Sequence, residues 1–204
     1  MKVRWSVGVG LLVVTAVSFV GAAYPTETFL QNIPTVPAVV ALIWADRRWG
    51  MTRGTFYGCV GFLTLHILGA RWIYSFVPYD DWAESFLGVR PTDVFGWRRN
   101  HYDRLVHFAS GALGLPPAAE LIRRGGGVAT RPAVVLAVAV VLAVGAVYEV
   151  FEWRIAVTMS PAHAEAYNGQ QGDVWDPQKD MALAGIGACA AAVVWWPRGS
   201  ASRL

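Results

Sequence analysis

The sequence has few charged residues and almost no cysteine. Aspartate, glutamate, lysine and arginine make up only 15% of its 204 residues, which is too few for the surface of an ordinary soluble domain. Its two cysteines, Cys59 and Cys189, form no CxxC pair and no set with histidine, so we expect packed, inert thiols rather than a disulfide or a zinc site. Neither a Ser/Gly-rich linker nor a fixed-period repeat is present, so we expect one domain over residues 1–204.

Several familiar catalytic patterns are also missing. The sequence contains no HExxH, no GxSxG and no phosphate-cradling glycine loop, which excludes the common protease and hydrolase templates. The net charge of +3 is not evidence of nucleic-acid binding, because the basic residues sit in short clusters between apolar runs. The expected partner is therefore the lipid bilayer, and we expect no nucleic acid.

Long apolar runs dominate what remains. Hydrophobic residues make up 55% of the chain, a composition typical of a polytopic membrane protein. The first run is followed by Gly21-Ala22-Ala23, so a cleaved signal peptide is the alternative to a retained first span. The sequence predicts an all-α transmembrane bundle with about six spans, at residues 5–23, 34–46, 52–76, 103–122, 132–156 and 179–196.

The arginines and lysines indicate the orientation of these spans. With six spans and a cytoplasmic N-terminus, every short inner segment is basic, as the positive-inside rule requires. The C-terminus is then cytoplasmic too, and we expect a multi-pass protein of the bacterial inner membrane. The inner basic residues are Lys2, Arg4, Arg47, Arg48, Arg53, Arg123, Arg124, Arg131, Arg198 and Arg203.

Nearly all the acids fall near the opposite, outer ends of the spans. Three pairs of polar residues there are spaced three or four apart, so the members of each pair share a helical face. A carboxylate close to hydrocarbon is costly and normally faces a protein interior or a water-filled cavity, which makes such residues candidates for a functional site. The pairs are Asp103 and His107, Glu149 and Glu152, and Asp176 and Asp180.

Two further features belong to the same region. Residues 172–181 form a polar segment that leads into the last apolar run, and this segment adds Asp173 to the acids. His66 lies thirteen residues past Arg53, which places it ~20 Å above the inner end of its helix. We expect His66, Arg104 and Gln178 to play secondary roles, although His66 could equally be a plain hydrogen-bond donor between helices.

These residues support two kinds of chemistry. Carboxylates with an imidazole suit a divalent cation such as Mg²⁺, Mn²⁺ or Zn²⁺, and the candidate ligands are His107, Glu149, Glu152, Asp176 and Asp180. The same groups could instead act as paired acid and base. The candidate catalytic residues are His107, Asp103, Glu149, Glu152, Asp173, Asp176 and Asp180. Some acids could also be simple ion pairs, such as Asp103 with Arg99 or Arg104, and Asp176 with Lys179.

Three segments resemble the YjdF-like family of bacterial inner-membrane proteins. They are residues 99–108 (RNHYDRLVHF), residues 148–153 (YEVFEW) and residues 171–181 (QGDVWDPQKDM). His66-x-x-Gly69 and Tyr74-x-x-Val77-Pro78 match the same pattern. The resemblance covers about residues 35–190 and implies no particular reaction. A looser similarity to VanZ-like membrane proteins implies a role near envelope lipids.

Three functions remain open from the sequence. The first is a membrane-embedded, metal-dependent enzyme whose outward-facing pocket acts on a lipid headgroup or a lipid-linked envelope precursor. The second is a proton- or cation-coupled transporter, although the inner half carries few ionisable groups and no inverted repeat is visible. The third is a structural or assembly protein whose polar cluster only holds the helices together.

Overall fold

The computed structural model describes residues 2–196, and all their regular structure is helical. No strand occurs among these residues. The helices are α1 (Lys2–Ser18), α2 (Pro25–Asn32), α3 (Thr35–Trp49), α4 (Arg53–Arg71), α5 (Tyr79–Leu87), α6 (Pro91–Phe95), α7 (Tyr102–Gly126), α8 (Thr130–Thr158), α9 (Pro161–Asn168) and α10 (Asp176–Trp195).

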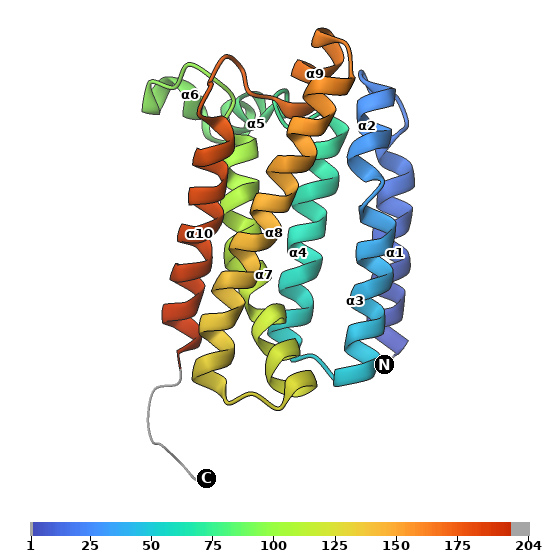
Figure 1. Ribbon diagram of the computed structural model, residues 1–204. Helices are drawn as coiled ribbons and strands as arrows, with labels where there is room; N and C mark the ends of the chain where they lie inside the picture. The colour runs from blue at the N-terminus through green and yellow to red at the C-terminus, as the bar shows by residue number, and fades with distance from the viewer. Residues whose placement is uncertain (1, 197–204) are drawn as a thin grey trace.

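The long helices form a bundle around α7, in which α4 and α8 run antiparallel to α7 and α10 runs parallel to it (Figure 1). Helix α7 packs against α4, α8 and α10, while α1 packs against α3 and α4. Helices α5, α6 and α9 lie at one end, which we call the outer end; the beginning of α1 and the last turn of α10 lie at the opposite, inner end. The α7–α8 and α3–α4 connections, with their arginines, are also at the inner end.

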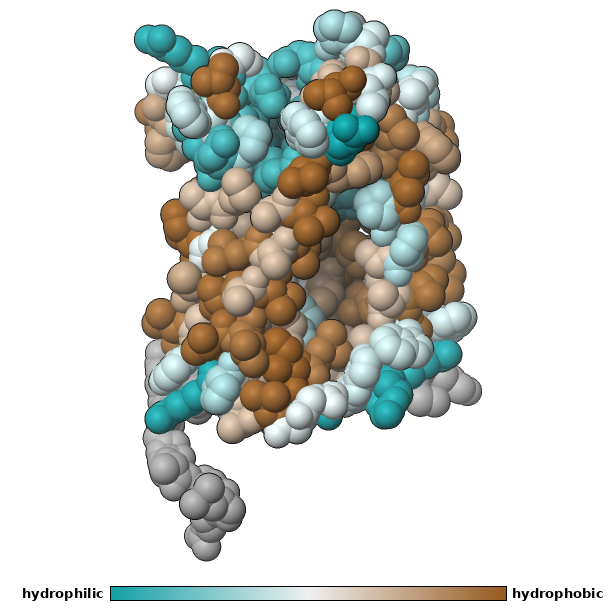
Figure 2. Space-filling model, viewed as in Figure 1, coloured by the Kyte–Doolittle hydropathy of each residue, from teal (hydrophilic) through white to brown (hydrophobic). Residues whose placement is uncertain are grey.

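Within residues 2–196, three helical segments are long and apolar enough to cross a membrane: Pro25–Trp49, Tyr102–Gly126 and Thr130–Thr158. The apolar part of α1, Arg4–Ser18, is shorter. Figure 2 shows brown apolar side chains along the middle of the molecule, with polar ones gathered at its two ends. The expected all-α membrane protein is therefore confirmed. The six spans and the cytoplasmic termini stay predictions, and Arg198 and Arg203 lie outside the described residues.

The second predicted span, residues 34–46, coincides with α3, but the membrane-length segment is longer. It begins at Pro25 with α2, which was not predicted, and α2 and α3 together form the segment Pro25–Trp49. The reason is that α2 buries polar residues, not apolar ones: Glu27, Thr28, Gln31 and Asn32. A helix with a buried polar face has the hydropathy of a surface loop.

The third predicted span ends too late. Helix α4 stops at Arg71 rather than continuing to residue 76, because Ile73 and Tyr74 adopt positive φ angles of 43° and 58°. Tyr74 folds back over Gly69, where a β-carbon would lie 2.7 Å from its ring. Glycine at residue 69 therefore makes room for the tyrosine ring in the bundle.

The first predicted span, residues 5–23, also ends too late, because α1 ends at Ser18. The other three spans agree more closely with the structure, and one thiol differs from expectation. Helices α7, α8 and α10 overlap the predicted spans at 103–122, 132–156 and 179–196 almost completely. Both cysteines are free; Cys59 is partly buried, but Cys189 is exposed on α10 rather than packed. The inward face of α10 carries Ala184 and Ala188 instead, and both are buried. Cys189 directly follows Ala188, so its side chain points away from the face of α10 that packs against the bundle.

Candidate acid and histidine site

Glycines bring the two helices that carry the site into direct contact. A β-carbon at Gly111 of α7 would lie 1.8 Å from the carbonyl oxygen of Ala184, and one at Gly187 of α10 would lie 2.1 Å from that of Phe108. Small residues allow membrane helices to approach this closely. The contact sets the outer turns of α7 and α10 side by side, so their polar residues face each other.

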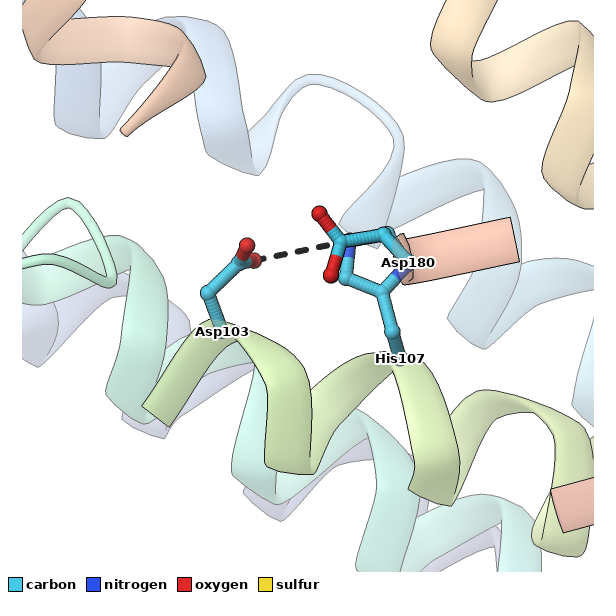
Figure 3. A group of neighbouring side chains, drawn as sticks. All are labelled: Asp103, His107 and Asp180. Carbon is cyan, nitrogen blue, oxygen red and sulfur yellow. Dashed lines mark ion pairs between the residues drawn. The ribbon is translucent and has the colours of Figure 1, made fainter. Parts of the chain in front are cut away.

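Three of the predicted site residues meet at this junction (Figure 3). Asp103 and His107 lie one turn apart on α7, with their side chains 3.5 Å apart at the closest Oδ1 and Nε2 atoms. Asp180 reaches them from α10, and one potential ligand atom from each of the three residues lies within 4.8 Å of the others. Asp180 is 3% exposed, and its Oδ1 has no hydrogen-bond partner. The group is therefore a set of two carboxylates and one imidazole, in which Asp180 is buried and Asp103 and His107 are partly buried.

Helix α8 contributes a fourth acid with no partner. Glu149 is 6% exposed, and neither of its carboxylate oxygens forms a hydrogen bond. Glu149 lies within electrostatic range of His107 and Asp103, although it is not one of the three grouped ligand residues. Glu152, one turn later, is only partly buried, and the Tyr148 hydroxyl is its hydrogen-bonding neighbour.

Asp176 lies in the same region but is fully engaged. Arg99 forms a two-pronged contact with it, with Nη1–Oδ1 and Nη2–Oδ2 distances of 2.6 and 3.3 Å. Both residues have little exposed surface, and Arg99 also donates to the backbone oxygen of Gln170. Such a bidentate pair fixes geometry strongly. The partner of Asp176 is thus Arg99, and not Lys179 as the sequence analysis considered.

Asp173 forms a second ion-pair cluster nearer the surface. It accepts hydrogen bonds from Arg104 and Lys179, each at 2.6 Å. The Lys179 ammonium lowers the pKa of the Asp173 carboxyl below its ordinary value of 3.8. Arg104 is therefore paired with Asp173, and Asp103 faces His107 instead of an arginine. Gln178 is exposed on α10.

His66 is held by hydrogen bonds on both ring nitrogens. Nε2 lies 3.1 Å from the carbonyl oxygen of Gln31 and 3.0 Å from the Thr35 hydroxyl, while Nδ1 meets the Tyr74 hydroxyl. Because a carbonyl oxygen only accepts, Nε2 carries the proton and Nδ1 accepts from Tyr74. His66 thus joins α4 to the α2–α3 segment, which matches its interpretation as a helix-to-helix donor.

A cavity of about 500 Å³ adjoins the group. Asp103 and His107 line it from α7, and His66 and Tyr74 line it from the α4 side. Tyr148 faces it from α8. The cavity connects the two histidines, which the sequence analysis placed at similar depth but on separate helices.

Sequence reasoning assigned no role to three tyrosines of this region, although all three lie in the segments that resemble the YjdF-like family. Tyr74, Tyr102 and Tyr148 lie around the histidines and acids, and Tyr102 donates to the backbone oxygen of Leu65. Tyrosine is common at membrane interfaces, so its presence near helix ends gave no specific signal. The pairing of Gly69 with a tyrosine five residues later was the available clue, because it marks a chain reversal.

The comparisons with known proteins agree with this picture. The profile of a family described as "Predicted membrane protein (DUF2238)" matches residues 3–200. The chain belongs to this family. The matched range includes every residue of the acid and histidine group and every described residue except Lys2.

The chain is also similar to a bacterial inner-membrane protein over most of its length. The chain is 33% identical to the inner membrane protein YjdF of Escherichia coli (strain K12) over 180 residues, which are 87% of this chain and 80% of that protein. The expected location in the inner membrane and the resemblance to YjdF-like proteins are confirmed. No solved structure matches the chain. The looser similarity to VanZ-like proteins stays a prediction.

Proposed function

We propose that the protein is a membrane-embedded, metal-dependent enzyme that acts on a lipid headgroup or a lipid-linked envelope precursor. One observation supports this most: Asp103, His107 and Asp180 offer three ligand atoms within 4.8 Å of one another, from two helices. Two carboxylates and an imidazole suit a divalent cation such as Mn²⁺ or Zn²⁺. This ligand set differs from the sequence prediction of His107, Glu149, Glu152, Asp176 and Asp180. It adds Asp103, it leaves out Asp176, whose oxygens Arg99 occupies, and it includes neither Glu149 nor Glu152.

The unpartnered acids support a cation rather than a purely structural cluster. A buried carboxylate without hydrogen bonds costs free energy, and proteins normally pair such a group. Asp180 Oδ1 and both oxygens of Glu149 have no partner among the described residues. A bound cation would supply the missing positive charge, and it would polarise a phosphoryl or carbonyl oxygen of a substrate. Glu149 then provides a free carboxylate as proton acceptor.

The alternatives receive less support from the same residues. A transporter needs polar groups along its whole path, whereas the inner half of the cavity is lined by apolar side chains such as Leu42, Met51 and Leu121. A purely structural cluster explains Asp173 and Asp176, since both are ion-paired. It does not explain Glu149, which has no bond to contribute.

Lipid turnover by reconstituted protein tests the proposal. The purified chain would be placed in vesicles made from bacterial inner-membrane lipids, with Mn²⁺ or Zn²⁺ or with a chelator, and headgroup release followed by mass spectrometry. We expect cation-dependent release that Asp180→Asn and His107→Ala abolish. Asp81→Asn is the matched control, because Asp81 is an exposed acid on α5 whose carboxylate pairs with Arg90. Equal turnover in Asp180→Asn and wild type would contradict the proposal.

A further inference from the structure

The cavity beside the acid and histidine group is much longer than the group itself. Its lining on α7 runs from Asp103 to Leu121, which spans ~27 Å at 1.5 Å per residue. That length approaches the ~30 Å thickness of a bilayer's hydrocarbon core. A volume of about 500 Å³ spread over this length makes the cavity narrow and elongated.

The two ends of this cavity differ in chemistry. Its ionisable and hydroxyl side chains, apart from Ser110 and the Cys59 thiol, are at the outer end, where Asp103 and His107 face His66 and the two tyrosines. Below them the wall is apolar and comes from α3, α4, α7 and α8. Leu63 and Leu113 lie in its middle, and Met51 and Leu121 lie near the inner end. The occupant that fits such a wall has one polar end and a long apolar tail.

One side of the cavity is open toward the bilayer. Helix α8 packs on α7, α9 and α10, and its substantial helix contacts include neither α3 nor α4. Val140 and Val144 of α8 line the cavity, yet they are 43% and 64% exposed. In Figure 2 a hollow framed by apolar side chains lies on this flank. Both valines are near the middle of the Thr130–Thr158 segment, at the depth of lipid chains.

We propose that this cavity holds one acyl chain of a bilayer phospholipid, which enters sideways between α3 and α8. The phospholipid's headgroup then lies at the Asp103, His107 and Asp180 group. The position of the opening identifies the occupant, because acyl chains are the material that surrounds α8 at this depth. The volume falls within the ~300–1,000 Å³ range of small-molecule sites, whereas a transmembrane helix is about 10–12 Å wide and would need a much broader groove.

This inference rests on the proposed function and narrows its substrate to a phospholipid. The two remain separable, because the acyl-chain wall and the three acidic and imidazole ligands are different residues. Gly145 of α8 lines the wall, and a β-carbon there meets no atom within 4 Å. A larger side chain at this position would occupy cavity space without a clash against the backbone. Ala41 lines the opposite wall from α3 and is exposed.

Photolabelling tests whether a phospholipid tail occupies the cavity. The full chain would be reconstituted in vesicles of phosphatidylethanolamine and phosphatidylglycerol that contain a phospholipid with a diazirine midway along one acyl chain. We expect labelled peptides from the wall around Leu113 and Val144. Gly145→Leu and Ala41→Phe should each lower this labelling about tenfold, as a loss of ~1.4 kcal/mol in binding would.

Matched variants outside the cavity serve as controls. Gly61→Leu introduces the same side chain at an exposed helical glycine of α4 that also has open space around it. Ala139→Phe does the same at an exposed alanine of α8 that does not line the cavity. Both controls should be labelled in the wall as strongly as wild type. Equal wall labelling in Gly145→Leu, Ala41→Phe and wild type would overturn the inference.

Two further measurements separate this inference from the proposed function. Gly145→Leu should bind Mn²⁺ with wild-type affinity, so lost labelling together with retained cation binding supports the acyl-chain site. Wall labelling in a wild-type chain that binds no divalent cation would overturn the metal-dependent function and leave a lipid-binding cavity. Stronger wall labelling by a diazirine-bearing polyprenyl phosphate than by the phospholipid would overturn the choice of an acyl chain.

Discussion

Two buried glutamates at opposite ends of the bundle have opposite surroundings. Glu120, at the inner end of α7, is 1% exposed and accepts hydrogen bonds from the backbone N–H of Thr52 at 3.0 Å and the Thr55 hydroxyl at 2.7 Å. Arg124 lies 3.8 Å away, one turn along the helix. Glu149, at the outer end of α8, is equally buried but has no hydrogen-bond partner.

The difference separates a structural acid from a candidate functional one. Paired charges stabilise a helix junction, and at the inner end both Asp46, bonded to Arg4, and Glu120 are used in this way. An unpaired buried acid weakens the fold and persists where another requirement maintains it. The outer end contains both kinds, since Asp173 and Asp176 are paired, while Glu149 and one oxygen of Asp180 are not.

Removing the inner glutamate should have the largest effect on stability. In Glu120→Ala, the Thr55 hydroxyl and the Thr52 N–H lose their acceptor, and Arg124 loses its charge partner. We expect the free energy of unfolding to fall by about 3–5 kcal/mol. A titration with sodium dodecyl sulfate in mixed micelles would measure it. A loss as small as that of an exposed acid such as Asp81→Ala would contradict the structural role.

The Arg99–Asp176 pair should show an intermediate effect. Arg99→Met removes the bidentate partner of Asp176, but Arg104 remains 3.6 Å from the same carboxylate. We therefore expect a smaller loss, about 2 kcal/mol. Combining Arg99→Met with Asp176→Asn should recover part of this loss, because no unpaired charge is then buried. If the double variant were as unstable as the sum of the two single variants, the two residues would not act as a pair.

Glu149→Gln should have the opposite effect to Glu120→Ala: stability should be retained and activity lost. Since the carboxylate makes no hydrogen bond to be lost, we expect the free energy of unfolding to stay within about 1 kcal/mol of wild type or to rise. Lipid turnover should nevertheless disappear in this variant. The mixed-micelle titration and the vesicle assay measure the two effects separately. A large loss of stability would place Glu149 in the same class as Glu120.

The smallest effect concerns Asp173 and acid pH. Its folded-state pKa is lowered, so its contact with Lys179 stabilises the fold above the ordinary pKa of 3.8 and is lost as the pH falls through the lowered value. The thermal midpoints of wild type and Asp173→Asn should therefore differ at neutral pH and converge as the pH falls from about 5 to about 2. Midpoints that differ by a constant amount over this range would show that the charge of Asp173 does not matter.

The sequence predicted the long apolar helices well, and for a physical reason. Residues 132–144 contain no charged side chain, so this segment is stable in lipid. A helix is the structure that satisfies its backbone hydrogen bonds there. The spacing of Asp103 and His107 likewise required only helical geometry. Helix α2 was missed because its buried face is polar, and its partners His66, His163 and Tyr167 are distant in sequence.

The assembly of the site needed the tertiary structure. Whether Arg99 pairs with Asp103 or with Asp176 depends on the tertiary structure, because the acid that Arg99 reaches, Asp176, is 77 residues away in the sequence. The cavity was also invisible in the sequence, because its wall consists of ordinary leucines, valines and alanines from four helices. Only the gap between α3 and α8 distinguishes them from a packed core.

The metal content of the purified protein tests the central claim most directly. Protein extracted in mild detergent without chelator would be supplied with Mn²⁺ or Zn²⁺, desalted and analysed by elemental mass spectrometry, beside Asp180→Asn and the control Asp81→Asn. We predict one bound divalent cation per chain in wild type and the control, and an affinity reduced at least about 100-fold in Asp180→Asn. Wild-type protein that retains no cation, or Asp180→Asn that retains as much as wild type, would contradict the account.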